Sequence, residues 1–157
     1  MKRSNKLDKW NYRYIGLAHK VASWSSCLSR KVGAVVTVNR RIVATGYNGA
    51  PAGVKSCREL GNCLRKNSPS GTNLDCCRGT HGEQNCLTQA AGSNISVRGG
   101  DMYVTTYPCA TCMKLIINSG IKRVFYTEYY NSPLTEALAK ESGIELIQIT
   151  PDENKEN

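Results

Sequence analysis

Two short motifs rich in potential metal ligands lie on either side of one predicted strand, and they constrain this chain more than any other feature. The first is His81-Gly82-Glu83 and the second is Pro108-Cys109-Ala110-Thr111-Cys112. Cys109 and Cys112 are three residues apart in the first turn of a predicted helix, so both thiols point the same way, and the helix dipole favours thiolate there. His81 precedes a second predicted helix and can supply a third ligand, so the fold has to bring both motifs to one place.

Three protein ligands leave the fourth tetrahedral position of a zinc ion for water, as catalytic zinc sites require. Two thiolates weaken the metal as a Lewis acid, which makes a nearby base valuable, and Glu83 lies beside the ligands without being one of them. Such a carboxylate can pass a proton from the water to N3 of cytosine as C4 is attacked. The motifs therefore predict removal of an amino group from a nucleobase. A structural zinc site is the alternative, although such sites usually close with four protein ligands.

The spacing of apolar residues predicts an α/β layer fold with helices on a largely parallel sheet. A stripe from Leu7 to Val21 predicts a first helix, and two β-branched runs joined by Asn39-Arg40 predict a hairpin. A polar loop from Gly46 to Gly79 follows, and a loop of this length is usually functional or held by something. Helices and strands then alternate, with helices over residues 83–91, 109–119 and 133–141 and strands over residues 102–106, 123–127 and 144–149.

Composition indicates a single domain over residues 1–150 and a polar, disordered tail over residues 151–157. No apolar run suits a signal peptide or a membrane span, so we expect a cytoplasmic protein with no membrane partner. In that reducing compartment the 8 cysteines are better explained by metal ligation than by disulfides. The net charge of +9 favours a phosphate-bearing partner without distinguishing a polymer from a free nucleotide.

The chain carries further motifs around this pair: His81 to Asn85, Met102 to Thr105, Pro108 to Cys112 and Ile116 to Ile121. Together they resemble the zinc-dependent cytidine deaminase superfamily over nearly the whole domain. The segment Gly46 to Gly53 and the strand Val32-Gly33-Ala34 resemble its deoxycytidylate deaminase branch, which includes bacterial and phage members. The resemblance implies a three-layer α/β/α fold with a central five-stranded mixed sheet. It also implies hydrolysis of dCMP to dUMP and ammonia, with dUMP supplied to thymidylate synthesis.

The same resemblance assigns substrate contacts. It places the Asn48 amide near the deoxyribose 3′-hydroxyl, although a turn residue tolerated for its left-handed backbone is the alternative. Gly82 stands where relatives usually carry Ala or Val. Its backbone N–H is a donor for the pyrimidine O2, and the missing methyl group suggests a looser base pocket or one that admits a 5-substituted cytosine. Tyr107 and Tyr130 are further candidate contacts, with core packing as the alternative role of each.

A second, closed zinc site occurs in phage and bacterial relatives, and the resemblance assigns it to cysteines in and near the long loop. The candidates are Cys27, Cys57, Cys63 and one of Cys76 and Cys77. Such a site would contribute the order that a polar loop cannot obtain from apolar burial.

Regulation is also implied by the resemblance. Members of the family form hexamers that dCTP activates and dTTP inhibits, with Mg²⁺ accompanying the triphosphate. The candidate effector contacts in this chain are Lys31, Asn48, Gly49 and Arg65.

Two other function classes compete with this interpretation. A deaminase acting on tRNA or single-stranded DNA would use the same zinc and glutamate and would also suit a positive charge. No added nucleic-acid module is evident, and the segment Gly46 to Gly53 resembles the free-nucleotide branch, so we expect no nucleic-acid partner. A non-catalytic zinc-binding module leaves Glu83 without a role.

Overall fold

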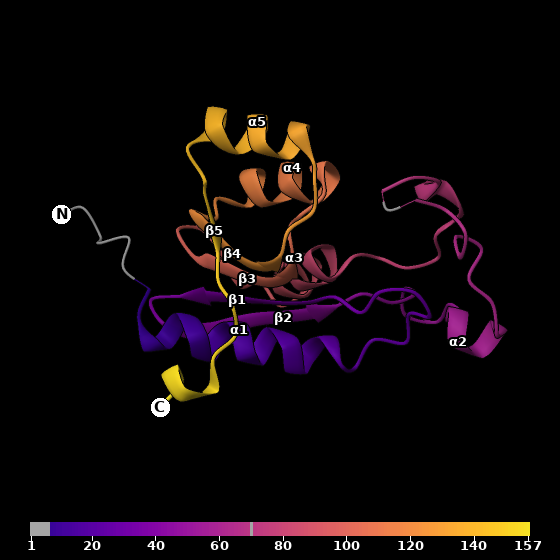
Figure 1. Ribbon diagram of the computed structural model, residues 1–157, viewed down its shortest axis with the longest axis horizontal. Helices are drawn as coiled ribbons and strands as arrows, with labels where there is room; N and C mark the ends of the chain where they lie inside the picture. Colours follow the sequence, from indigo (N-terminus) through magenta and orange to yellow (C-terminus); the bar gives the residue numbers. More distant parts are fainter. Residues whose placement is uncertain (1–6, 70) are drawn as a thin grey trace.

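A five-stranded mixed sheet forms the centre of the computed structural model, which describes residues 7–69 and 71–157 (Figure 1). The strands are β1 (Gly33–Val38), β2 (Arg41–Tyr47), β3 (Asp101–Thr106), β4 (Arg123–Glu128) and β5 (Glu145–Gln148). Their order in the sheet is β2-β1-β3-β4-β5. The strand β1 runs antiparallel to β2 and β3, whereas β3, β4 and β5 are parallel. The predicted five-stranded mixed sheet is confirmed.

Helices cover both faces of this sheet and give three layers. The helix α1 (Lys9–Ala22) lies on one face, and α3 (Gly82–Gly92), α4 (Ala110–Ser119) and α5 (Pro133–Ser142) lie on the other (Figure 1). Alternate strand residues supply the two cores, because successive side chains of a strand point to opposite faces. The core with α1 contains Val35, Tyr103 and Phe125, and the core with the other three helices contains Val36, Met102 and Val124.

Two glycines let helices approach the hairpin of β1 and β2 closely. A Cβ on Gly33 would collide with the backbone of Ala18 and Ala22 in α1. A Cβ on Gly46 would collide with backbone atoms of Gly82 and Cys86 in α3. Since backbone cannot yield as a flexible side chain can, these two positions require glycine.

The predicted long loop is largely irregular and projects from the body of the domain as a lobe, which we define as residues 50–79 (Figure 1). It contains two short elements, α2 (Cys57–Leu60) and the 3-10 helix η1 (Leu74–Cys76), and neither element buries a residue. Gly49 and Thr80 exchange two backbone hydrogen bonds of 3.1 and 2.8 Å at the base of the lobe. The lobe is therefore closed at its base but contributes no apolar core through these two elements.

The C-terminal residues differ from the expected disordered tail. Glu153–Lys155 form a 3-10 helix, η2, that packs against α1. The Arg13 side chain donates a hydrogen bond to the backbone carbonyl of Glu156, and the Lys155 ammonium group lies 5.1 Å from the centre of the Tyr12 ring. Polar composition led to the expectation of disorder, and specific contacts with α1 account for the difference.

None of the helices within residues 7–69 and 71–157 combines the length and apolar character needed to cross a membrane.

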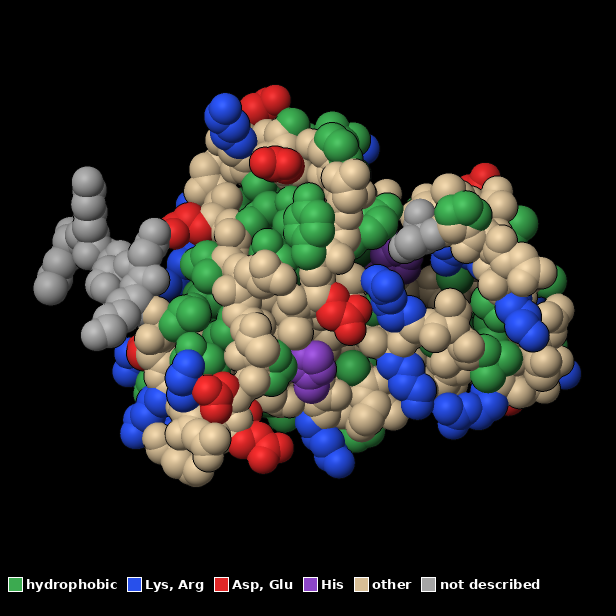
Figure 2. Space-filling view, viewed as in Figure 1, with side chains coloured by type: hydrophobic (Ala, Val, Ile, Leu, Met, Phe, Trp, Pro, Cys, Tyr) green, Lys and Arg blue, Asp and Glu red, His purple; other side chains and the backbone are tan. Residues whose placement is uncertain are grey.

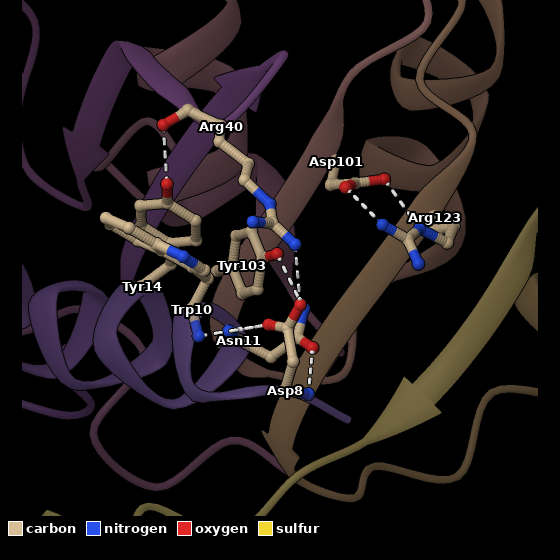
Figure 3. A network of polar contacts seen from close by, with 8 residues as sticks. All are labelled: Asp8, Trp10, Asn11, Tyr14, Arg40, Asp101, Tyr103 and Arg123. Atoms are coloured by element: carbon tan, nitrogen blue, oxygen red, sulfur yellow. Dashed lines mark hydrogen bonds and ion pairs between the residues drawn. The ribbon is translucent and has the colours of Figure 1, made fainter. Parts of the chain in front are cut away.

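Polar contacts join the amino ends of α1, β3 and β4 (Figure 3). Arg123 donates two hydrogen bonds to the Asp101 carboxylate, of 2.8 and 2.6 Å, and the two side chains are only 19% and 13% exposed. Beside this pair, the buried Asn11 amide donates to the Tyr103 hydroxyl at 2.9 Å. A bidentate ion pair at this depth loses stability when one partner is removed, because the other charge stays desolvated.

We predict that Asp101→Asn lowers the free energy of unfolding by about 2 kcal/mol, measured by urea denaturation, because Arg123 then keeps a poorly paired charge. Combined with Arg123→Met, it should show a coupling energy above about 1 kcal/mol in a double-mutant cycle. Asp8→Asn is the control: it retains an N-cap residue but weakens the more exposed pair with Arg40, and should cost less than about 1 kcal/mol. Additive losses at Asp101 and Arg123 would contradict the prediction.

Candidate active site

Three side chains with metal-ligand chemistry meet where the amino ends of α3 and α4 come together. His81 is the N-cap of α3, Cys109 is the N-cap of α4, and Cys112 lies in the first turn of α4. His81 Nδ1 lies 3.5 Å from Cys109 Sγ and 3.3 Å from Cys112 Sγ. Within the part of the chain that the structure describes, these are the metal-ligand donors found within 4.8 Å of one another. The structure thus brings together the three residues that the sequence motifs singled out.

The spacing of these donors matches a tetrahedral zinc centre. Zinc bonds of about 2.1 Å to nitrogen and about 2.3 Å to sulfur at a tetrahedral angle separate the two atoms by roughly 3.6 Å. The observed separations of 3.3 and 3.5 Å are close to that value. One imidazole and two thiols are also ligands that zinc prefers, so the donor set fits this metal.

The electrostatics of the site favour thiolate at Cys109. A hydrogen bond from Cys112, with further help from His81, lowers the pKa of Cys109 to about 4. The hydrogen bond with Cys109 in turn raises the pKa of His81. Both helices also direct their amino ends, where the helix dipole is positive, toward the site. Cys109 is therefore prepared to bind a cation.

Glu83 lies beside these donors on the first turn of α3, with only 4% of its surface exposed. Burial raises the pKa of its carboxyl group to about 7. An acid with a pKa near neutrality can both accept and release a proton at cellular pH, which is what a general acid and base must do. The position and the environment of Glu83 agree with the role expected from the sequence.

A cavity of about 270 Å³ adjoins these side chains. Among the described residues that line it, Glu83 is the one carboxylate. Three arginines also line it: Arg30, Arg65 and Arg78. Figure 2 shows a hollow between the body of the domain and the lobe, with Lys and Arg side chains on its rim. A cavity of this size and charge suits a small anionic ligand.

Asn48 lines this cavity and also holds one of its walls. Its side-chain amide accepts a hydrogen bond of 2.8 Å from the Val32 N–H and donates one of 2.7 Å to the Arg30 carbonyl. Its backbone N–H donates to the Val32 carbonyl at 3.1 Å. Asn48 therefore braces the segment that carries Arg30, a role that the sequence did not indicate.

Gly82 also lines the cavity, but its missing methyl group does not leave an empty volume. A Cβ there would lie 3.1 Å from the Val32 carbonyl oxygen and 3.4 Å from Val32 Cγ1. The space is therefore already filled by Val32, and this packing argues against the expectation that Gly82 loosens or widens the base pocket.

Tyr107 and Tyr130 are both among the lining residues, and Tyr107 has a packing role as well. The Tyr107 ring meets Tyr126 edge-on at 4.9 Å between ring centres and lies 5.2 Å from the Tyr129 ring. Tyr130 packs against the core formed with α3, α4 and α5, and its hydroxyl lies beside Gly71 of the lobe. Both roles that the sequence left open for these tyrosines thus coexist.

Four of the five other candidate cysteines line the same cavity: Cys27, Cys57, Cys63 and Cys77. Burial, followed by the neighbouring Cys63, Cys27 and Cys77 thiols, raises the pKa of Cys57. Cys76 is exposed and is not among the lining residues. Among the described residues, Cys77 and not Cys76 therefore shares the cavity lining with Cys27, Cys57 and Cys63, although no three of these thiols lie within 4.8 Å of one another.

Apart from Arg65, the arginines and serines that line the cavity were not predicted from the sequence. Arg30 and Arg78 line the cavity together with Ser26, Ser29 and Ser68. Lys31, a candidate effector contact, is exposed and is not among the lining residues, whereas Gly49 is. The sequence did contain a cue for both arginines, because Arg78 lies just before the His81 motif and Arg30 lies just before the first strand.

Comparison with known proteins connects this site to one family. The model of the cytidine and deoxycytidylate deaminase zinc-binding region matches residues 8–128. The deoxycytidylate deaminase of Schizosaccharomyces pombe is 38% identical over 148 residues, which cover 92% of this chain but 45% of that protein. The ComE operon protein 2 of Bacillus subtilis is 35% identical over 145 residues, covering 92% of this chain and 73% of that protein. The chain therefore spans less than half the length of the S. pombe relative.

Among solved structures, a dCMP deaminase of the cyanophage S-TIM5 in complex with dCMP and dUMP superposes with a TM-score of 0.73 at 29% sequence identity. The match covers 87% of this chain and 93% of the cyanophage chain. The fold and its connectivity are therefore shared over nearly the whole domain.

We predict that Glu83 makes the stability of the chelator-treated protein depend on pH. The pKa of Glu83 is raised in the folded state, so its contribution to stability is present below the unfolded value near 4.5 and is lost as pH rises through about 7. Relative to Glu83→Gln, the wild type should lose up to about 3 kcal/mol in its free energy of unfolding between pH 4.5 and 8. Urea denaturation across this range measures the difference. Parallel profiles for the two proteins would contradict the prediction, and the exposed Glu145→Gln is the control.

Proposed function

Because this chain belongs to the cytidine and deoxycytidylate deaminase family, we propose that it hydrolyses dCMP to dUMP and ammonia in the cavity described above. The observation that carries the proposal is the buried Glu83 carboxylate beside three converging donors at a cavity lined by arginines. The substrate is suggested by relatives: the S. pombe protein is a deoxycytidylate deaminase, and the cyanophage enzyme was solved with dCMP and dUMP.

In this proposal His81, Cys109 and Cys112 hold a catalytic zinc ion. Support comes from their spacing and from the thiolate character of Cys109. When bound, zinc is a Lewis acid that makes a water molecule nucleophilic at neutral pH. His81, Cys109 and Cys112 would supply three protein ligands, the number found in catalytic zinc sites that keep a place for water.

Glu83 is the proposed general base and general acid. Its carboxylate takes a proton from the attacking water and delivers it to N3 of the cytosine ring. It then takes the second proton of that water from the new C4 hydroxyl and delivers it to the departing amino group, so that ammonia leaves and the C4 carbonyl forms. One water is consumed and one ammonia is released, so the reaction needs no oxidant or reductant. A pKa of about 7 for the buried carboxyl group supports both proton transfers.

The proposed base and sugar contacts lie along the same cavity. The Gly82 N–H is the donor for the pyrimidine O2, and Asn48 contacts the deoxyribose 3′-hydroxyl. Each of the two polar atoms of the Asn48 amide already makes one hydrogen bond, and each has capacity for one more. Tyr107 and Tyr130 flank the substrate as lining residues.

Arg30, Arg65 and Arg78 are the proposed partners of the 5′-phosphate. Arg65 Nε donates to the Thr72 carbonyl at 2.8 Å, and Arg78 Nε donates to the Lys55 carbonyl at 3.1 Å. These bonds anchor two guanidinium groups by one nitrogen, so that their terminal nitrogens can serve a phosphate.

Regulation and assembly extend the proposal. We propose a hexamer that dCTP activates and dTTP inhibits, with Mg²⁺ bound to the triphosphate and dUMP serving thymidylate synthesis in the cytoplasm. The candidate effector contacts are Lys31, Asn48, Gly49 and Arg65. An effector can act in this way only if dCTP prefers the active arrangement and dTTP the inactive one.

A second, structural zinc ion held by Cys27, Cys57, Cys63 and Cys77 completes the proposal. Support comes from the presence of all four in one cavity lining and from the mutual effect of their thiols on Cys57. Four thiolates would form a closed tetrahedral site that ties the lobe to the segment before β1.

Ammonia release is the measurement that tests this function. We expect zinc-loaded protein to deaminate dCMP well above deoxycytidine and a cytosine-containing oligonucleotide, because the cavity is small and lined by arginines. We also expect it to favour dCMP over CMP, because the relatives that suggest the substrate are deoxycytidylate deaminases. Glu83→Gln should reduce the rate on dCMP by at least about 100-fold while leaving zinc content unchanged. Adding dCTP or dTTP with Mg²⁺ tests the regulation in the same assay.

Preferred turnover of the oligonucleotide would instead support a polynucleotide deaminase. An absence of ammonia from every substrate, with zinc bound, would support a non-catalytic module.

The second zinc predicts a stoichiometry of about two zinc ions per chain, because two complete ligand sets are proposed. Elemental analysis of fully active protein should find one of them lost in Cys77→Ser but retained in Cys76→Ser, its matched neighbour. A single zinc ion per chain in fully active wild type would contradict the second site and leave the catalytic one intact.

A further inference from the structure

We propose that Thr135 of α5 is a positioning residue for Cys109, acting through the backbone carbonyl of Pro108. The inference rests on the zinc site of the proposed function. It starts from the way in which the chain passes from the end of β3 into α4, because Cys109 belongs to that connection rather than to the helix itself.

Cys109 is less constrained by its own helix than Cys112 is. Cys112 lies inside α4, where it is fully buried next to Met113, whereas Cys109 has extended backbone angles as the N-cap. The direction of the Cys109 thiol therefore depends on the peptide that joins it to Pro108. That peptide is planar, so whatever holds the Pro108 carbonyl also orients the bond that leads into Cys109.

Three hydrogen bonds hold this connection, and each reaches a different element. The Tyr107 N–H donates to the Glu128 carbonyl of β4 at 2.8 Å, and the Cys109 carbonyl accepts from Met113 of α4 at 2.9 Å. Proline has no N–H, so Pro108 offers only its carbonyl. That carbonyl accepts a hydrogen bond of 3.0 Å from the Thr135 hydroxyl of α5.

The Thr135 hydroxyl is itself held in place. Its side chain is fully buried, and its oxygen lies 2.8 Å from Ser132 Oγ. Because the Thr135 proton is directed to Pro108, the Ser132 hydroxyl is the donor in that second contact. A hydrogen bond received by a hydroxyl strengthens the one it donates, so Ser132 reinforces the bond from Thr135 to Pro108.

The Ser132 side chain serves this relay instead of its usual role. Ser132 is the N-cap of α5, yet its hydroxyl makes no capping hydrogen bond to the helix backbone. A serine cap typically stabilises a helix by about 1 kcal/mol. The fold forgoes that contribution at α5, which agrees with a positioning role for the Ser132–Thr135–Pro108 relay.

Zinc retention tests the inference independently of catalysis. Thr135→Val has nearly the same shape but leaves the buried Pro108 carbonyl without its donor, and it should release zinc to a chelator about tenfold faster than the wild type. Thr135→Ser keeps the hydroxyl and should stay within about twofold of the wild-type rate. In cobalt-substituted protein, Thr135→Val should also change the thiolate-to-metal absorption band, and Thr135→Ser should restore it.

Tyr103→Phe is the matched control. It removes another buried hydroxyl, whose hydrogen bond to Asn11 lies at the opposite end of β3, so it should lower stability without affecting zinc release or the cobalt spectrum. A Thr135→Val protein that behaves like Tyr103→Phe in all three measurements would overturn the inference. So would a Thr135→Ser protein as impaired as Thr135→Val.

If Thr135→Val does not fold, Ser132→Ala provides the test. It removes the donor at the far end of the same relay, so it should speed zinc release by about threefold and displace the cobalt band. Wild-type zinc release together with a wild-type cobalt spectrum would overturn the inference. A wild type that binds no zinc at all would refute the proposed function itself. Normal zinc retention in the wild type and in every relay variant would refute only the role of Thr135.

Discussion

The meeting of two helix amino ends at the carboxyl end of β3 is the constraint on which the rest of this molecule depends. It requires α3 to lie almost against the β1–β2 hairpin, which Gly46 permits because any side chain there would collide with the helix backbone. It also directs two positive helix ends at one point, where they favour thiolate and any bound anion. Without this arrangement His81 would not reach Cys109 and Cys112 at the start of α4.

Burial sets the acidity of Glu83 at this meeting point of the two helices. Glu83 is withdrawn from water on the face of the sheet that α3, α4 and α5 cover, and desolvation brings the pKa of its carboxyl group close to neutrality. This costs stability whenever the carboxylate is ionised, and Glu83 is the group that moves a proton in the proposed reaction. Polar contacts also lie at the far end of the sheet, in the Asp101–Arg123 pair and the Asn11–Tyr103 hydrogen bond. They stabilise the fold and have no role in the proposed reaction.

The lobe is the part of the domain that apolar packing explains least. Its two short elements bury no residue, and its base is joined by two backbone hydrogen bonds between Gly49 and Thr80. Yet it supplies much of the cavity lining, including Arg65 and Arg78. A segment that lacks a core of its own needs another source of order, which is why the four gathered cysteines matter as a proposed second metal site.

Local sequence was sufficient for the main helices and strands and for singling out the donors of the two motifs, because hydrophobic periodicity, turn residues and ligand spacing are properties of short segments. The hairpin at Asn39-Arg40, the alternation after the lobe and the residues His81, Glu83, Cys109 and Cys112 all follow from such patterns. Only the tertiary structure decided what depends on contacts between distant segments. It placed Cys77 and not Cys76 in the cavity lining, showed that Val32 fills the space beside Gly82, engaged the Asn48 amide with the backbone before β1, and folded the C-terminal residues onto α1. No spacing within one segment encodes such contacts, because they form only when the sheet brings their partners together.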